Sequence, residues 1–269
     1  MSDPAATQKA QARAIFERVA PEYDVAGPGC FAHFGRRLAE VAELGPGQRV
    51  LDVATGRGAV LFPAAERVGP TGEAVGVDLA EGMIRLTRAE ATRRGADVSL
   101  RVMDAEDLDF PDASFDRVLC GFGIMFFPRL DRALGEFRRV LKPGGRVALS
   151  TWRISQGQDL AATLAGLGLI QLDAVSALSF NTPERLETPL TVAGFTDTHA
   201  ESDETIFRFA DLEQYWQDAR GTGLRRWLDA LDAEQRERAL AALAARLAPH
   251  QRADGLYLAS SAMLAVASR

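Results

Sequence analysis

Short apolar runs alternate with helical stretches through the first half of the chain. The runs that are short enough for one strand each lie at residues 49–54, 74–80, 98–107, 115–124 and 146–152. Between the last two, apolar side chains from Leu130 to Leu141 recur with helical spacing and form one stripe. This alternation of strand and helix predicts a parallel sheet built from βα units.

The pattern is different before and after this stretch. Residues 8–44 read as two helices, separated by the segment "APEYDVAGPG" at residues 20–29. After residue 152 the alternation ends. Residues 153–181 and 211–248 are predicted to be helical, residues 196–210 and 255–269 are predicted strands, and Thr182 is a predicted helix N-cap.

Composition and charge exclude several classes of protein. The 269 residues carry a net charge of -6 and no long basic run, which disfavours nucleic acid and anionic membranes as partners. Cys30 and Cys120 form no CxxC pair, and no group with metal-ligand spacing was found, so neither a disulfide framework nor a metal site is expected. The most apolar segment, residues 160–172, is too short to insert across a membrane, and the polar N-terminus is not a secretory signal. We therefore expect a cytoplasmic protein.

Three carboxylates stand at or near the ends of the first three apolar runs. They are Asp52, Asp78 and Asp104, each 26 residues after the previous one. The carboxyl ends of parallel strands share one edge of a sheet, and ligands bind in the crevice there. Asp78 is placed to accept the hydroxyls of a ribose, and Asp104 to accept an exocyclic amine.

A loop of small residues, "ATGRGA" at 54–59, follows the first of these acids. Such a loop lets a ligand approach the backbone and the first turn of the next helix. Its spacing is not the GxGxxG of dinucleotide-binding folds, which disfavours a nicotinamide dehydrogenase. An acid before the glycines repels a pyrophosphate and suits an ammonium or a sulfonium. The alternative is a glycine turn needed only for packing.

Together these motifs point to a known family. "VLDVATGRG", "AVGVDLAEGMIRLTRA" and the segment from "MDAEDLDFP" to "STW" resemble the class I S-adenosylmethionine-dependent methyltransferases. The likeness is strongest to the small-molecule branch around the ubiquinone/menaquinone-biosynthesis methyltransferases, and it covers residues 14–152 closely. Ala54 departs from the pattern, because the family usually has glycine there. The resemblance implies a Rossmann-like α/β fold with a mostly parallel sheet, an antiparallel last strand and helical lid elements.

The resemblance also implies a division of the chain and roles for matching positions. A single domain is expected, with N-terminal helices (8–44), a cofactor-binding core (48–152), a substrate lid with the sixth strand (153–253) and a final strand (254–269). The cofactor is S-adenosyl-L-methionine. Its methionine part is expected near Asp52, Ala54, Thr55, Gly56, Gly58, Cys120 and Gly121, its ribose at Asp78, its adenine at Leu79, Met83, Asp104 and Ala105, and Tyr23 closes over it.

The resemblance implies in-line methyl transfer, which depends mainly on positioning. Many relatives have histidines after the fourth strand, where this chain has Met125 and Phe126, so the catalytic base is left open. Tyr23 and His33 are candidates, with cofactor packing and a surface or capping position as their respective alternatives. The predicted substrate pocket is lined by Met125, Phe126, Tyr215 and Trp216.

The expected function is methyl transfer to a small, rather apolar molecule of secondary or quinone-type metabolism. One alternative is a methyltransferase-like fold that binds the cofactor but catalyses another reaction, such as a cyclisation. A non-catalytic binding module is a second alternative, against which the three strand-end acids argue. The atom that accepts the methyl group and the oligomeric state are left open.

Overall fold

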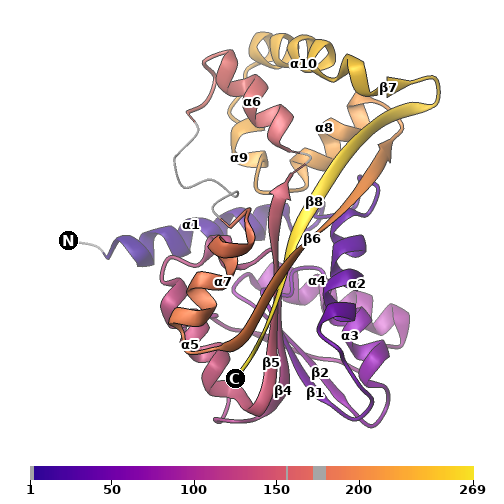
Figure 1. Cartoon of the computed structure of the whole chain (residues 1–269). Coiled ribbons are helices and arrows are strands. Elements are labelled where there is room, and N and C mark those ends of the chain that lie inside the picture. Colours follow the sequence, from indigo (N-terminus) through magenta and orange to yellow (C-terminus); the bar gives the residue numbers. More distant parts are fainter. Residues whose placement is uncertain (1–2, 156, 172–179) are drawn as a thin grey trace.

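The computed structural model describes residues 3–155, 157–171 and 180–269, and its strands form one mixed sheet (Figure 1). The strand order is β3-β2-β1-β4-β5-β8-β6, with the short β7 paired to β8. Strands β1 to β5 are parallel, and β8 runs antiparallel to both β5 and β6. The predicted fold class is confirmed. The strands are β1 (Arg49–Val53), β2 (Glu73–Asp78), β3 (Ser99–Val102), β4 (Phe115–Gly121), β5 (Leu141–Ile154), β6 (Thr196–Phe209), β7 (Gln251–Arg252) and β8 (Gly255–Ser268).

Helices cover both faces of the sheet. They are α1 (Pro4–Val19), α2 (Cys30–Val41), α3 (Leu61–Val68), α4 (Glu81–Arg94), η1 (Ile124–Phe126), α5 (Leu130–Val140), α6 (Gln158–Gly166), α7 (Pro183–Val192), α8 (Leu212–Arg220), α9 (Arg225–Leu228), α10 (Ala233–Leu247) and η2 (Ala248–His250). Alternate residues of each strand point to opposite faces. Thus Val50 belongs to the core shared with α2 and α3, whereas its neighbour Leu51 belongs to the core shared with α5 and α7.

Several local predictions need correction. The third strand is shorter than expected and ends at Val102, and Asp104 lies just beyond it in a turn bridged to Asp107. The predicted helix over residues 153–181 is only partly correct. Residues 153 and 154 belong to β5, and the helix that follows, α6, ends at Gly166. Residues 156 and 172–179 of that prediction lie outside the described residues. The N-cap is confirmed, because the Thr182 hydroxyl accepts the Arg185 N–H at 3.4 Å.

A helical cap stands on the extended ends of β6 and β8. Each of these strands has 14 residues, and both pass beyond the core sheet towards α6, α8, α9 and α10, which we call the cap (Figure 1). The cap helices bury Leu164, Trp216 and Leu243 against strand residues such as Phe209. Because this cluster also includes Phe34 of α2, the cap and the core sheet share one apolar interior.

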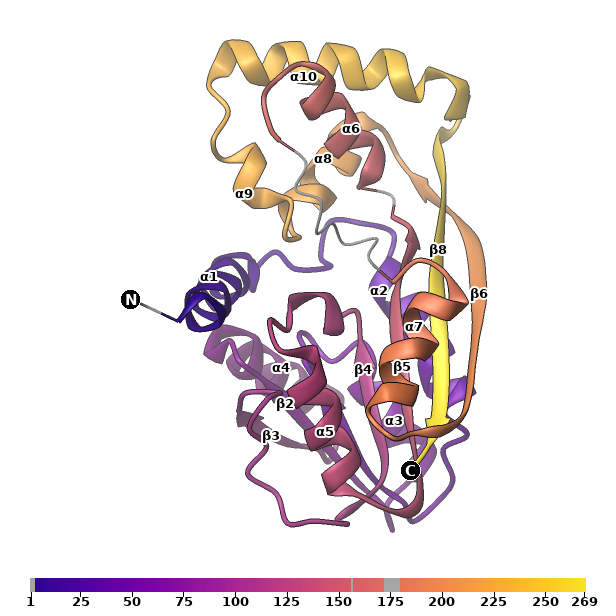
Figure 2. The same ribbon diagram turned by 60° about the vertical axis from the view of Figure 1, so that its left-hand side comes forward.

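The segment that joins α1 to α2 connects the core and the cap. Figure 2 shows α1 beside α4, with this segment continuing beneath the cap. Gln214 of α8 donates a hydrogen bond to the Ala26 carbonyl at 2.9 Å, and Arg225 of α9 pairs with Glu22 at 3.0 Å. No described helix is both long and apolar enough to cross a membrane.

Candidate active site

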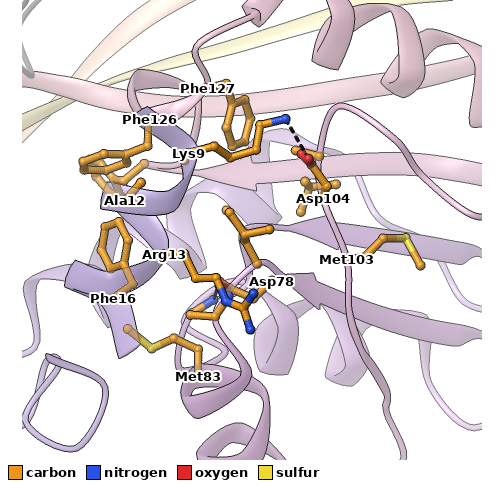
Figure 3. Close-up of a pocket in the computed structure, with 18 of the residues that line it drawn as sticks. Lys9, Ala12, Arg13, Phe16, Asp78, Met83, Met103, Asp104, Phe126 and Phe127 are labelled. Carbon is orange, nitrogen blue, oxygen red and sulfur yellow. Dashed lines mark hydrogen bonds and ion pairs between the residues drawn. The ribbon is translucent and has the colours of Figure 1, made fainter. Parts of the chain in front are cut away.

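A pocket lies at the carboxyl ends of the parallel strands, with α1 across its mouth (Figure 3). Its floor comes from the loops after β1, β2, β3 and β4, as expected for a parallel α/β sheet. The lining residues are Lys9, Ala12, Arg13, Phe16, Tyr23, Val53, Ala54, Gly56, Asp78, Leu79, Ala80, Met83, Met103, Asp104, Ala105, Glu106, Gly121, Phe122, Gly123, Phe126, Phe127 and Pro128.

The carboxylate of Asp78 ties the end of β2 to the small-residue loop. Its two oxygens accept the backbone N–H groups of Gly56 and Ala80, each at 2.9 Å. The loop is held from its other side by the Thr87 hydroxyl, which donates to the Gly56 carbonyl at 2.7 Å. Desolvation raises the pKa of Asp78, and the two N–H donors oppose that shift. The carboxylate is therefore fixed at the pocket with acceptor capacity remaining for a ligand.

Sequence reasoning missed the lysine at the other end of the pocket. The Lys9 ammonium lies 2.6 Å from a carboxylate oxygen of Asp104 and 2.6 Å from one of Glu106. The second oxygen of Glu106 accepts the Arg129 N–H at 3.0 Å. Partial burial alone would lower the pKa of Lys9, but the two carboxylates raise it above its usual value. Lys9 lies on a polar helix 95 residues before Asp104, so no local pattern could have indicated the contact.

Four of the predicted cofactor residues lie outside the pocket lining. Asp52 is buried, and one of its oxygens accepts the Thr55 hydroxyl at 2.6 Å. Burial raises the pKa of Asp52 to about 7, although the bond from Thr55 lowers it. Cys120 is fully buried, which raises the pKa of its thiol. The fourth residue, Gly58, adopts φ +82°, and a Cβ there would meet the ring of Phe62.

Of the two candidate bases, only Tyr23 lines the pocket. Its ring lies between Phe16 and Phe31, with centroids at 6.2 and 5.0 Å. Desolvation raises the pKa of Tyr23 well above its usual value, and nearby carboxylates add to the effect, so Tyr23 is a neutral phenol. His33 packs edge-on against Phe34 at 5.0 Å, among the aromatic side chains behind the pocket.

The four predicted substrate residues occupy different places. Phe126 lines the pocket, and its ring meets that of Phe16 edge-on at 4.9 Å. Met125 is half-buried and packs against the core shared with the cap. Tyr215 and Trp216 are each 1% exposed in the cap interior and do not line this pocket. Their helix turns its apolar face inward, which places both rings in the core.

Comparisons with known proteins show which families this chain is similar to. A family described as "Methyltransferase domain" matches residues 50–145. The nocamycin O-methyltransferase of Saccharothrix syringae is 34% identical over 88% of this chain and 90% of its own length. An aklanonic acid methyltransferase from a Streptomyces species is 44% identical over 53% of the chain and 66% of its own length. The demethylmenaquinone methyltransferase of Thermus thermophilus is 33% identical over 68% of the chain and 91% of its own length.

The chain belongs to the class I S-adenosylmethionine-dependent methyltransferases. Among solved structures, the YcgJ protein from Bacillus subtilis has a TM-score of 0.58 at 19% identity, covering 88% of this chain and 98% of that one. The [4+2]-cyclase SpnF has a TM-score of 0.55 at 22% identity, covering 88% and 80%. Likeness at such identities shows the fold alone. The cyclase alternative is therefore not favoured, because relatives that are similar over most of this sequence, such as the nocamycin O-methyltransferase, are methyltransferases.

The pocket suits the family's cofactor, S-adenosyl-L-methionine. The fixed Asp78 carboxylate offers acceptor positions for sugar hydroxyls, and the apolar side chains of Leu79 and Met83 stand beside it in the lining. The carboxylate of Asp104 lies further along the same pocket. These groups fit a ligand that combines a ribose with a flat base bearing an amine.

Proposed function

We propose that the chain methylates an oxygen of a small, mainly apolar acceptor in secondary metabolism. Support for oxygen comes from the nocamycin O-methyltransferase, because the similarity to it covers 88% of this chain and 90% of that protein. The aklanonic acid relative supports an acceptor of secondary metabolism. The observation that carries the proposal is an aromatic wall in the pocket.

The aromatic wall is built by Phe16, Tyr23, Phe122 and Phe126, which all line the pocket. They come from α1, the segment after it, the loop after β4 and η1. Behind them, Phe122 packs against Trp152 with centroids 4.2 Å apart. Rings in edge-on and offset arrangements bind planar unsaturated molecules through both apolar area and ring geometry. The acceptor is therefore an unsaturated or aromatic molecule with few charges.

Within this proposal, some of the predicted cofactor residues contact the cofactor and the others support the loop beneath it. Asp78 accepts the ribose hydroxyls, Leu79 and Met83 pack on the adenine, and Asp104 with Ala105 recognises its amine edge. Ala54, Gly56 and Gly121 border the methionine part. The buried Asp52, with Thr55, Gly58 and Cys120, supports the loop from below.

The bound cofactor supplies an electrophilic methyl group on a sulfonium. With S-adenosyl-L-methionine bound, the wall would present the acceptor oxygen to the methyl group, and such positioning provides much of the rate. The oxygen would form its bond to the methyl carbon as the carbon–sulfur bond breaks, and the electron pair would leave on the thioether product. Tyr23 is a neutral phenol and a poor base. We therefore infer that the acceptor oxygen is acidic, for example a carboxylate, an enol or an activated phenol, and reacts as its anion.

The test is a methylation assay with methyl-labelled cofactor and fused-ring acceptors that carry a carboxylic acid, an enol or a phenol. Two control acceptors are used. In one the oxygen is already methylated, and in the other the rings are saturated. We expect label in a methoxy group or methyl ester, identified by its carbon chemical shift, and a pH–rate profile that follows the acceptor's own pKa. Methylation on carbon, or equal turnover of the saturated acceptors, would contradict the proposal.

A further inference from the structure

Helix α1 is held firmly at one end only. Of its sixteen residues, Val19 alone is fully buried. Phe16 and Val19 pack in a small apolar cluster with Ala80 and Met83. At the same end the Glu17 carboxylate accepts the Gly82 N–H at 2.8 Å. The C-terminal end of α1 thus has both apolar and polar anchors on the core.

The other half of α1 depends on Lys9. Residues 4–13 contribute no fully buried side chain. Near the N-terminus Asp3 pairs with Arg129, but both side chains are more than 40% exposed, and such surface pairs stabilise little. Lys9, by contrast, bridges Asp104 and Glu106 at 2.6 Å each, and the Glu106 side chain is only 2% exposed. A carboxylate this buried needs a partner, so the bridge is the main attachment of this half.

The bridge lies on the face of α1 that covers the pocket. The helix lines the pocket with Lys9, Ala12, Arg13 and Phe16, which are spaced at i, i+3, i+4 and i+7 and so share one face (Figure 3). The partners of Lys9 follow β3, at the side proposed above for adenine. The position of α1 over the pocket is therefore linked to the carboxylates that border the cofactor.

We propose that Lys9 is a positioning residue that latches α1 over the cofactor. When its ammonium leaves Asp104 and Glu106, the N-terminal half of α1 lifts about the anchored Phe16–Ala20 end, and the cofactor or its product exchanges. When the bridge forms, α1 closes and the exchange slows. This inference rests on the proposed placement of the cofactor in this pocket.

The chain offers a direct probe, because Lys9 and Lys142 are its only two lysines. Lys142 also forms an ion pair, with Asp116 at 2.8 Å, but it lies on β5 and does not line the pocket. We expect saturating S-adenosylhomocysteine to slow acylation of Lys9 by an amine-reactive reagent, read by peptide mass spectrometry. The rate at Lys142 should not change. Equal labelling of Lys9 with and without bound S-adenosylhomocysteine would overturn the latch.

The second test measures release of S-adenosylhomocysteine by stopped-flow fluorescence. Lys9→Met should raise the dissociation rate roughly tenfold and change the association rate much less. The control Lys142→Met also removes an ion-paired lysine and should leave both rates unchanged. Lys9→Arg retains a cation that can bridge two carboxylates and should restore most of the slow release.

The outcomes separate the two proposals. A Lys9→Met protein that binds S-adenosylhomocysteine with the wild-type dissociation rate overturns the latch and leaves the proposed function standing. Failure of the wild-type protein to bind S-adenosylhomocysteine overturns the placement of the cofactor, and the latch with it. Binding by Lys9→Met also shows that this variant is folded.

Discussion

Ala54 and Gly123 lie next to each other in the pocket lining, and a methyl group at Gly123 would lie 2.7 Å from the Cβ of Ala54. Ala54 adopts φ +56°, a left-handed conformation that favours glycine. Ala54 thus occupies a position where the left-handed backbone favours glycine, which is the residue that the family usually has there. The missing side chain at Gly123 provides the room that the extra methyl group of Ala54 occupies.

We therefore predict that Ala54→Gly stabilises the protein. Relief of the left-handed conformation contributes about 1 kcal/mol, partly offset by the greater flexibility of glycine in the unfolded chain. Thermal unfolding followed by calorimetry measures the effect. The control is Gly123→Ala, which should destabilise the protein because its methyl would meet both Ala54 and Cys120. A lower melting temperature for Ala54→Gly would contradict the conclusion that the left-handed conformation of Ala54 destabilises the protein.

Asp78→Ala should weaken binding of S-adenosylhomocysteine by roughly 1.5–3 kcal/mol, the usual effect of losing hydrogen bonds to a charged acceptor. Titration calorimetry measures the affinity. Asp78→Asn is the matched variant, because its amide oxygen can still accept the Gly56 N–H and keep the loop in place. We expect an affinity between those of wild type and Asp78→Ala. Unchanged affinity in both variants would refute the ribose assignment.

Substitutions at the adjacent residues Phe126 and Met125 should affect different properties of the protein. Phe126→Ala removes part of the aromatic wall, so the acceptor KM should rise roughly tenfold, as expected for about 1.4 kcal/mol of lost contact. Cofactor affinity should change much less. Met125 packs into the core instead, so Met125→Ala should lower the melting temperature and leave the acceptor KM nearly unchanged. Steady-state kinetics and thermal unfolding distinguish these results, and the reverse pattern would show that the acceptor lies elsewhere.

Trp216→Ala should lower the free energy of unfolding by about 3–5 kcal/mol, since it removes a large buried ring. Denaturant titration measures the loss. Trp216→Phe retains most of the volume and should cost much less. In the folded protein, S-adenosylhomocysteine affinity should match wild type for both variants. A selective loss of acceptor turnover with full stability would restore Trp216 to the substrate site.

The buried Asp52 should make stability depend on pH. Its pKa is raised to about 7 in the folded protein, well above that of an exposed carboxyl. The folded state therefore holds the proton more tightly, so this contribution is complete below about pH 4 and is lost as the pH rises towards 7. Asp52→Asn cannot titrate but can still accept the Thr55 hydroxyl. The difference in melting temperature between this variant and wild type should favour the variant more at pH 8 than at pH 5. A difference that does not change with pH would contradict the raised pKa of Asp52.

Periodic features of the sequence were sufficient to predict the core. The recurrence of Asp52, Asp78 and Asp104 every 26 residues reflects successive βα units, and the carboxyl ends of those strands do meet at one edge. The glycine-containing loop follows from the same local rules, whereas the order of the strands was not predicted. The prediction of a helix over residues 153–181 was partly wrong because this segment is apolar without a clear period. Such a sequence is compatible with either the end of a strand or a helix.

The contacts that complete the candidate site were beyond sequence reasoning. Lys9 lies on a mostly polar helix, and its carboxylate partners are nearly a hundred residues away. An aromatic pair such as Tyr215 and Trp216 is equally suited to a core or a ligand pocket, because both environments are apolar. Only the packing of α8 against Phe209 and the cap decides between them.

The cap is carried by β6 and β8, and this construction limits how the molecule can diversify. These two continuous strands join the cap to the core sheet. From Ser268 to Ala262, β8 is paired with β5, whereas the cap-side ends of β6 and β8, which form the tip, contact the cap helices, β7 and α2. Substitutions at the tip can therefore accumulate without disturbing the register beside the pocket. The sequence of the cap can drift through evolution while the arrangement of the residues that line the pocket is inherited unchanged.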